Sequence, residues 1–157
     1  MRVVLTRRAA HLRTHRGEVS FPGGRLEPGE APLSGALREA CEEVGLEPAG
    51  VEPLGTLSVV RTFSSASVIT PVVVELPARP GIAANPAEVE YAFDVALADL
   101  AAPGVMSEEI WSVPEQPGPG AGGTAEVTVH FFDLVQDVVW GATARILVEL
   151  MGIVLGD

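Results

Sequence analysis

Apolar and polar residues recur along the chain with spacings that divide it into strands and helices. Residues 3–8 begin with apolar and β-branched side chains and end in two arginines, and residues 17–21 alternate, so each segment predicts a short strand. Over residues 31–44 apolar side chains recur every three or four positions and Gly45 follows, which predicts a helix that ends at this glycine. The same spacing predicts a second helix over residues 138–151.

The middle of the chain predicts further strands. Residues 51–63 and 67–76 follow the first helix, and the apolar character of the second segment is continuous enough for a central strand in a sheet. Residues 89–100 predict a strand followed by a short helical turn. Residues 109–113 and 127–134 predict the two strands of a hairpin.

Together these elements predict an α/β or α+β protein. Of the 157 residues 47% are hydrophobic and 5% aromatic, which suits a compact single domain over 1–157. Pro- and Gly-rich stretches at 77–88 and 114–126 are expected to be loops of that domain, the second of them mobile. No apolar run is long enough to span a membrane, and Cys41 is the single cysteine, so we expect a soluble cytoplasmic protein in which Cys41 is inert packing.

Charge is distributed unevenly along the chain, whose net charge is -11. Residues 1–25 contain six of the ten arginines and one acid, whereas residues 26–157 carry four arginines and twenty acids. The acidic excess argues against nucleic acid as a partner, while an arginine cluster beside carboxylates suits a small phosphorylated ligand. A solvated basic strand end explains the charges equally well at this point.

Three glutamates of the first predicted helix indicate a cation site. Glu39, Glu42 and Glu43 are three and four residues apart, so their carboxylates leave one face of the helix and repel one another unless cations lie between them. Hard oxygen ligands favour Mg²⁺ or Mn²⁺. Gly23 and Gly24 lie in a tight turn before the helix, where bare backbone can approach a metal or a phosphate. A solvated acidic helix with a glycine cap explains each residue singly, but not the set.

The spacing of these residues resembles the Nudix box. It runs from Gly24 over five residues to Glu30, over seven to Arg38 and Glu39, over two to Glu42 and Glu43, and over one to Gly45. The resemblance implies a Nudix-type α/β/α sandwich with a mixed sheet and a loop-helix-loop metal site. It also implies hydrolysis of a nucleoside diphosphate linked to another group.

The resemblance also implies roles for individual residues of the box. Glu39 and Glu43 would be the main metal ligands, Glu42 a further ligand or base, and the Gly23 carbonyl a backbone ligand. Arg38 and Glu30 would pair and orient the carboxylates.

The segment before the box is similar to an additional signature of the coenzyme A pyrophosphatase branch. The matching residues are Leu5, Thr6, Arg8, Ala9, Arg13, Gly17, Phe21, Pro22, Gly23 and Gly24. This similarity implies hydrolysis of coenzyme A to 3',5'-ADP and 4'-phosphopantetheine. Guanidinium groups bind phosphate in a bidentate manner, so Arg8, Arg13, Arg16 and Arg25 are expected to bind the substrate. The backbone at Gly24 is expected to bind it as well.

Two departures from that branch are visible. Val4 replaces a usual leucine, and Glu27 and Glu30 stand where aspartates are common. Members of the branch usually have another strand before the position of Val3; its lack would expose a sheet edge that could pair with a second copy, which leaves a homodimer open.

Several alternatives stay open. The general base is Glu42 or Glu88, although an exposed loop acid is the simpler interpretation of Glu88. The substrate could be ADP-ribose or a dinucleotide, and a nucleotide sensor without activity is a third hypothesis. His11 and His15 line the nucleotide site or lie on the surface. The core and the buried strand face are expected to hold the larger aromatic residues Trp111, Trp140, Tyr91 and Phe93.

Overall fold

Within residues 1–12, 14–62, 67–76, 81–114 and 123–156, which a computed structural model of the protein describes, the chain forms ten strands and three helices. Their order is β1 (Arg2–Arg8), β2 (Val19–Ser20), α1 (Pro32–Val44), β3 (Glu52–Thr56), β4 (Val60–Arg61), β5 (Val68–Ile69), β6 (Val72–Glu75), β7 (Val89–Ala96), α2 (Leu97–Leu100), β8 (Met106–Pro114), β9 (Thr124–Asp133), β10 (Val138–Trp140) and α3 (Gly141–Leu155).

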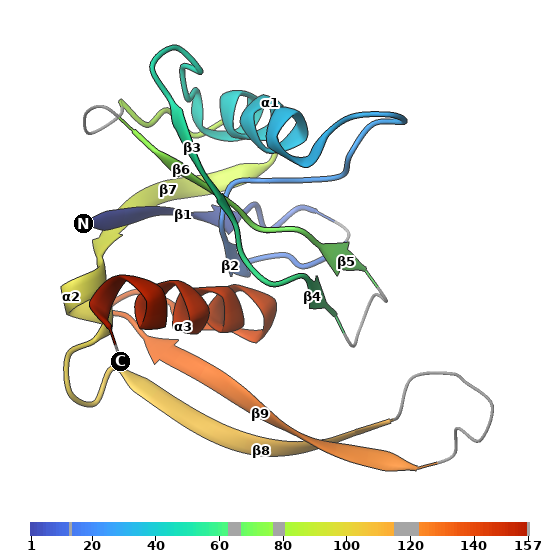
Figure 1. Ribbon diagram of the computed structural model, residues 1–157, viewed down its shortest axis with the longest axis vertical. Coiled ribbons are helices and arrows are strands. Elements are labelled where there is room, and N and C mark those ends of the chain that lie inside the picture. Colours follow the sequence, from blue (N-terminus) through green and yellow to red (C-terminus); the bar gives the residue numbers. More distant parts are fainter. Residues whose placement is uncertain (13, 63–66, 77–80, 115–122, 157) are drawn as a thin grey trace.

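The two long helices lie on opposite sides of the strands (Figure 1). Helix α1 packs against β6 and β7, whereas α3 packs against β9, β10 and β4. The hairpin of β8 and β9 extends away from this body. None of the helices in the described ranges has both the length and the apolar character needed to cross a membrane.

The strands form four small sheets, with the orders β2-β1-β7, β10-β9-β8, β3-β6 and β4-β5. All their pairings within the described residues are antiparallel, so the expected α+β architecture is confirmed, whereas the parallel pairs of a mixed sheet are not found there. Strands β1 and β7 pair residue by residue from Arg2 with Ala96 to Arg7 with Tyr91, and then skip Glu90. Such a bulge changes which side the following residues face.

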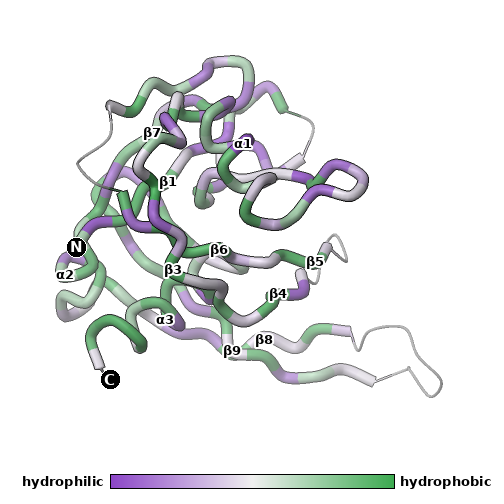
Figure 2. The backbone as a smooth tube through the Cα atoms, turned by 45° about the horizontal axis from the view of Figure 1, so that its top comes forward, coloured by the Kyte–Doolittle hydropathy of each residue, from purple (hydrophilic) through white to green (hydrophobic). Residues whose placement is uncertain are grey.

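One hydrophobic cluster joins the sheet of β1 to α2, β9, β10 and α3. Its fully or almost fully buried members are Leu5, Val19, Leu97, Leu100, Phe132, Val139, Ala144 and Leu147. The tube of α3 is mostly hydrophobic in Figure 2, as expected for a helix that covers this cluster. The core therefore ties the C-terminal elements to the strand that leads into the glycine-rich turn.

Helix α1 confirms the prediction made from its spacing. Pro32 lies in its first turn, where the absence of an N–H costs nothing. Gly45 has a φ of 66° and closes the helix, its N–H bonded to the Cys41 carbonyl at 3.0 Å. Only glycine adopts this left-handed conformation without strain, so the sequence contained both ends of the helix.

Two elements differ from their predictions. Residues 67–76 are not one central strand: they form β5 and β6, separated at Thr70 and Pro71, because proline has no N–H to donate to a ladder. The predicted helix over 138–151 begins instead with β10, which pairs with β9, and α3 starts at Gly141 and continues to Leu155. The predicted hairpin is correct but longer at both strands.

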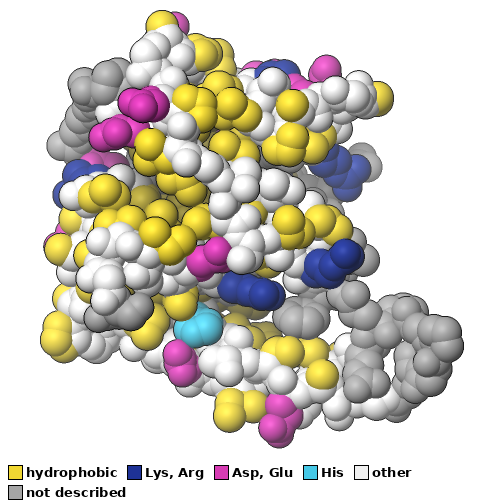
Figure 3. All heavy atoms as spheres, viewed as in Figure 1, with side chains coloured by type: hydrophobic (Ala, Val, Ile, Leu, Met, Phe, Trp, Pro, Cys, Tyr) yellow, Lys and Arg dark blue, Asp and Glu magenta, His cyan; other side chains and the backbone are white. Residues whose placement is uncertain are grey.

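The side chains expected in the core are partly exposed. Trp111 and Trp140 are 39% and 41% exposed, and they stack loosely with Phe131 on one face of the β8–β9–β10 sheet. Helix α3 covers the other face, which explains why Phe132 is buried and its neighbour is not. Figure 3 likewise shows hydrophobic side chains at the surface of the hairpin. Cys41 is exposed, so it is not core packing.

Candidate active site

Three carboxylates meet where α1 faces the start of β7. One oxygen each from Glu39, Glu43 and Glu88 lies within 4.8 Å of the others. Glu39 and Glu43 are four residues apart on α1 and therefore share a face, whereas Glu88 comes from the loop before β7. The structure thus adds an acid from outside the helix to the pair that the helical spacing predicted.

Glu43 is the most buried acid of this group, with its side chain 3% exposed. The Gly23 N–H donates to its Oε2 at 2.9 Å, and Arg8 Nη1 lies 3.9 Å from its Oε1. Burial raises the pKa of the Glu43 carboxyl, and the charges of Glu39 and Glu88 raise it further, against the lowering effects of Gly23 and Arg8. Burial makes the negative charge of Glu43 unfavourable, and a cation bound beside the carboxylate would stabilise that charge.

Gly24 lies directly against Glu39. A Cβ at position 24 would be 2.3 Å from the carboxyl carbon of Glu39, closer than atoms can approach. The preceding Gly23 has a φ of 155°, which favours glycine. The two glycines therefore let the backbone of the turn approach the carboxylates, as their position in the sequence predicted.

A second network holds the turn against α1. Arg38 donates from Nε and Nη2 to the two oxygens of Glu30 at 2.9 and 3.0 Å, and from Nη1 to Glu39 at 3.0 Å. The Glu30 carboxylate also accepts the Glu27 N–H at 2.9 Å. The bonds from Arg38, and then that from Glu27, lower the pKa of Glu30 to about 2, and the bonds to Glu30 and then Glu39 raise the pKa of Arg38. The predicted pairing of Arg38 with Glu30 is present in the structure.

Gly35 is a residue of this network that the sequence analysis missed. It lies in α1, and a Cβ there would be 2.4 Å from Leu26 and 2.9 Å from the Glu30 carboxylate. The loop over residues 26–30 can therefore lie close to the helix. A glycine in the interior of a helix, where it costs about 1 kcal/mol relative to alanine, was the available signal.

Glu42 is placed differently from the other two acids of the helix. Its side chain is 52% exposed and lies 3.5 Å from Arg38 Nη1, outside the three-carboxylate group. Helical spacing places Glu42 and Glu43 to either side of Glu39, and in the structure the Glu42 side chain lies beside Arg38 instead of joining Glu43. Of the three predicted carboxylates, the structure brings Glu39 and Glu43 together, and Glu42 as a further ligand or base stays a prediction.

Glu88 is held in the group by its own loop and is only partly exposed. Its carbonyl accepts the Ala9 N–H at 2.9 Å, and the His11 ring lies 3.0 Å from the neighbouring Ala87 carbonyl through Nε2. The simpler interpretation of Glu88 as an exposed loop acid is therefore wrong. His15 lies at the surface, where its Nδ1 is 2.9 Å from Oε2 of Glu18.

The arginines expected to bind substrate are only partly brought together. Arg8 faces Glu43, and its Nε is buried without a hydrogen-bond partner among the described residues. Arg16 and Arg25 are exposed, and the Arg25 carbonyl accepts a bond from Arg38 at 3.0 Å. Arg13 lies outside the described residues.

The two arginines at the C-terminal end of β1, Arg7 and Arg8, have different partners. Arg8 faces the carboxylates, whereas Arg7 bonds the buried Asp137, which also accepts the hydroxyl of Tyr91. Arg7 further contacts Glu90 at 3.2 Å. Arg7 is thus committed to the turn before β10, and Arg8 is left for the candidate site.

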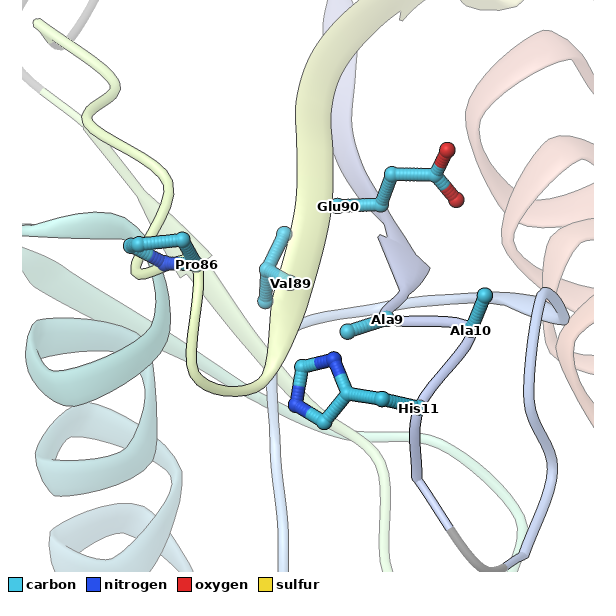
Figure 4. A pocket seen from close by; sticks show the side chains of 6 residues that line it. All are labelled: Ala9, Ala10, His11, Pro86, Val89 and Glu90. Carbon is cyan, nitrogen blue, oxygen red and sulfur yellow. The ribbon is translucent and has the colours of Figure 1, made fainter.

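An open hollow of about 400 Å³ lies next to the segment that follows β1. Its lining comes from that segment, from the loop before β7 and from the first residues of β7, namely Ala9, Ala10, His11, Pro86, Val89 and Glu90. Figure 4 shows the His11 ring between its own loop and the loop that joins Pro86 to Val89. The walls are mainly apolar, and Glu90 places one carboxylate at the side of the hollow.

The residues of the site fit a hard divalent cation. The donors are carboxylate oxygens, which Mg²⁺ and Mn²⁺ prefer. The burial of Glu43 and the proximity of the three acids favour a positive charge between them. The buried Nε of Arg8, which has no hydrogen-bond partner within the part of the chain that the structure describes, is suited to an anion at the same place.

The fold and the site can now be compared with known proteins. A crystal structure of the MutT protein from Methanosarcina mazei Go1 aligns with a TM-score of 0.50 and 23% identity over 62% of this chain and 68% of that one, which supports the fold. An uncharacterized Nudix hydrolase NudL of Photorhabdus laumondii is 36% identical over 149 residues, which are 94% of this chain and 74% of that protein.

Other comparisons agree. Nudix hydrolase 3 of Caenorhabditis elegans is 42% identical over 102 residues, which are 62% of this chain and 42% of that protein. A family model described as the NUDIX domain matches residues 1–116. The chain therefore belongs to the family of Nudix hydrolases.

Proposed function

We propose that this Nudix hydrolase cleaves the diphosphate bond of coenzyme A or its derivatives, using Mg²⁺ or Mn²⁺. Water would attack one phosphorus, the bridging P–O bond would break, and the products would be 3',5'-ADP and 4'-phosphopantetheine or its acyl form. The observation that carries the proposal is the group formed by Glu39, Glu43 and Glu88 beside Gly24 and Arg8.

The chain's own residues would bind and orient the diphosphate. Arg8 would donate to a phosphate oxygen through the buried Nε that lacks a partner among the described residues. Glu39 and Glu43 would hold the cation, with the Gly23 carbonyl as a further ligand. When bound, a divalent cation neutralises phosphate charge and activates water for attack. Arg38, fixed by Glu30, would keep Glu39 in place.

The proton of the attacking water needs an acceptor, and two acids are candidates. Glu88 belongs to the carboxylate group, and Glu42 lies at its edge, half exposed. Loss of the base removes the acidic limb of the pH–rate profile, whereas loss of a ligand raises the metal concentration needed for half-maximal rate. Glu88→Gln and Glu42→Gln, each assayed over pH 6–9 and over Mn²⁺ concentration, separate the two roles.

The choice of coenzyme A rests on the arginines and glycines of residues 4–24. Coenzyme A carries a 3'-phosphate besides its diphosphate, and the exposed cations Arg16 and Arg25 could meet it. The mainly apolar hollow beside Ala9 and Pro86 offers space for an uncharged part of the substrate.

The direct test is a turnover assay with Mg²⁺ or Mn²⁺ that identifies products by mass, with and without chelator. Coenzyme A, acetyl-coenzyme A, ADP-ribose and a diadenosine polyphosphate form the panel. We expect coenzyme A or its acyl form to have the highest kcat/KM and all turnover to stop with chelator. A higher kcat/KM for ADP-ribose or the dinucleotide would show that this compound, and not coenzyme A, is the substrate. Tight binding without product would indicate a sensor.

A further inference from the structure

Asn85 connects the end of α1 to the loop that carries Glu88. Its backbone N–H donates to the Glu43 carbonyl at 2.9 Å, and its side-chain Nδ2 donates to the Glu42 carbonyl at 3.2 Å. The last carbonyls of a helix have no partners within the helix, so Asn85 satisfies two of them. This fixes Asn85 relative to the turn of α1 that carries the acids.

The other two polar groups of Asn85 shape the loop itself. Its Oδ1 accepts the Ala87 N–H at 3.1 Å, and its carbonyl accepts the N–H groups of Glu88 and Val89 at 3.0 and 2.8 Å. A side-chain oxygen that bonds the N–H two residues on is the usual device by which asparagine forms a turn. All four polar groups of Asn85 are therefore used, two toward α1 and two toward the loop.

These bonds determine where Glu88 stands with respect to Glu43. One residue, Asn85, bonds the backbone of both, and the carboxylates of both belong to the group within 4.8 Å. On its far side the loop is held by bonds to the segment after β1, from Ala9 and His11. The loop is linked to the helix that bears Glu39 and Glu43 by Asn85 and by Ala83, whose N–H donates to the Val44 carbonyl at 3.0 Å; of the two, Asn85 also bonds the backbone of Glu88.

We propose that Asn85 is a positioning residue for the cation site, which holds the Glu88 carboxylate at bonding distance from the ion bound by Glu39 and Glu43. The inference rests on the proposed metal site and adds Glu88 as the third carboxylate ligand. Groups that orient metal ligands typically change metal affinity tenfold to a hundredfold when they are removed. A residue that merely capped α1 would change the stability of the fold and not the affinity for the ion.

The test uses Mn²⁺ alone and the full chain, with free Mn²⁺ measured by its electron paramagnetic resonance signal. Asn85→Ala should weaken Mn²⁺ binding about tenfold. Glu88→Gln should weaken it by at least as much, and the double variant should bind no more than about twofold more weakly than Glu88→Gln, because Asn85 acts through Glu88. Asn85→Ser keeps a local acceptor for the Ala87 N–H and cannot reach the Glu42 carbonyl, so it should be as weak as Asn85→Ala and replaces it if the alanine variant does not fold.

Thr143→Val is the matched control. The Thr143 hydroxyl donates to the Val19 carbonyl at 3.1 Å, so this variant also loses one bond from a side chain to a distant main chain. It should lower the melting temperature and leave Mn²⁺ affinity unchanged. If both Asn85 variants lower the melting temperature but bind Mn²⁺ as the wild type does, or if their effect adds fully to that of Glu88→Gln, the positioning role is refuted.

The same titration separates this inference from the proposed function. Wild-type binding of Mn²⁺ that depends on Asn85, without cleavage of coenzyme A, would uphold the inference and overturn the substrate. Unchanged affinity in Glu39→Gln would overturn the metal site and the inference together.

Discussion

At the scale of single residues, Gly24 separates the requirements of function from those of stability. A methyl group there would meet the end of the flexible Glu39 side chain, which can move away, rather than rigid backbone. Gly24→Ala should therefore change the free energy of unfolding by only about 0.5 kcal/mol. Because the Glu39 carboxylate must move to make room, turnover should fall about a hundredfold.

Gly81→Ala provides the control for Gly24→Ala. An added Cβ at Gly81 would meet no atom of the described residues within 4 Å, and its backbone does not need glycine. This variant should match the wild type in both unfolding and turnover. Full activity of Gly24→Ala would mean that Glu39 does not act from the position seen in the structure.

The ionisation of Glu30 should make the free energy of unfolding depend on pH in the acidic range. Its folded-state pKa of about 2 lies below the ordinary 4.5, chiefly because Arg38 bonds its carboxylate. A lowered pKa contributes stability that is complete above pH 4.5 and is lost as the pH falls from 4.5 toward 2. Urea unfolding from pH 2 to 7 should show a shallower acid decline for Glu30→Gln than for the wild type. The exposed Glu47, changed to Gln, should leave the wild-type decline intact, and equal slopes for all three proteins would contradict the role of the Arg38 pair.

At the scale of elements, the sequence predicted what is locally encoded. Helix α1 is specified by its own spacing, Pro32 and Gly45, and the box residues follow from it. Pro71 was a local signal for the division of 67–76 into β5 and β6, but the pairing of the two halves with different strands, β4 and β3, is not contained in the local pattern. Glu88 looked like any loop acid because its place depends on the bonds of its loop to the end of α1 and to the segment after β1, both distant from it in the sequence. An asparagine before a proline was the signal for a turn there.

The two faces of the β8–β9–β10 sheet should differ in what they contribute to stability. Phe132 is fully buried between this sheet and the rest of the core, whereas Trp111 on the opposite face is 39% exposed. Phe132→Ala should cost about 3–5 kcal/mol of unfolding free energy. Trp111→Ala should cost roughly 1–2 kcal/mol, since much of the ring is already in contact with water. Urea unfolding of both variants measures the difference, and equal costs would mean that a further contact covers Trp111.

At the scale of the whole molecule, a cation should stabilise a chain that carries a net charge of -11 and gathers three acids at one point. A ligand that binds only the folded state adds about 2.7 kcal/mol at a concentration one hundred times its Kd. For a protein of this size that corresponds to a rise of about 5–10 °C in melting temperature. Mn²⁺ or Mg²⁺ should produce this rise in the wild type, and Glu43→Gln should lose most of it because a charged ligand is missing.

General screening of the negative charge could also raise the melting temperature, so the cation must be compared with salt of equal ionic strength. NaCl weakens repulsion among all exposed acids alike and should stabilise the wild type and Glu43→Gln equally. A divalent ion held by Glu39, Glu43 and Glu88 should instead stabilise the wild type far more than the variant. If Mn²⁺ raised both melting temperatures by the same amount as NaCl, the acids would be a screened surface rather than a binding site, and the proposed hydrolysis would lose its physical basis.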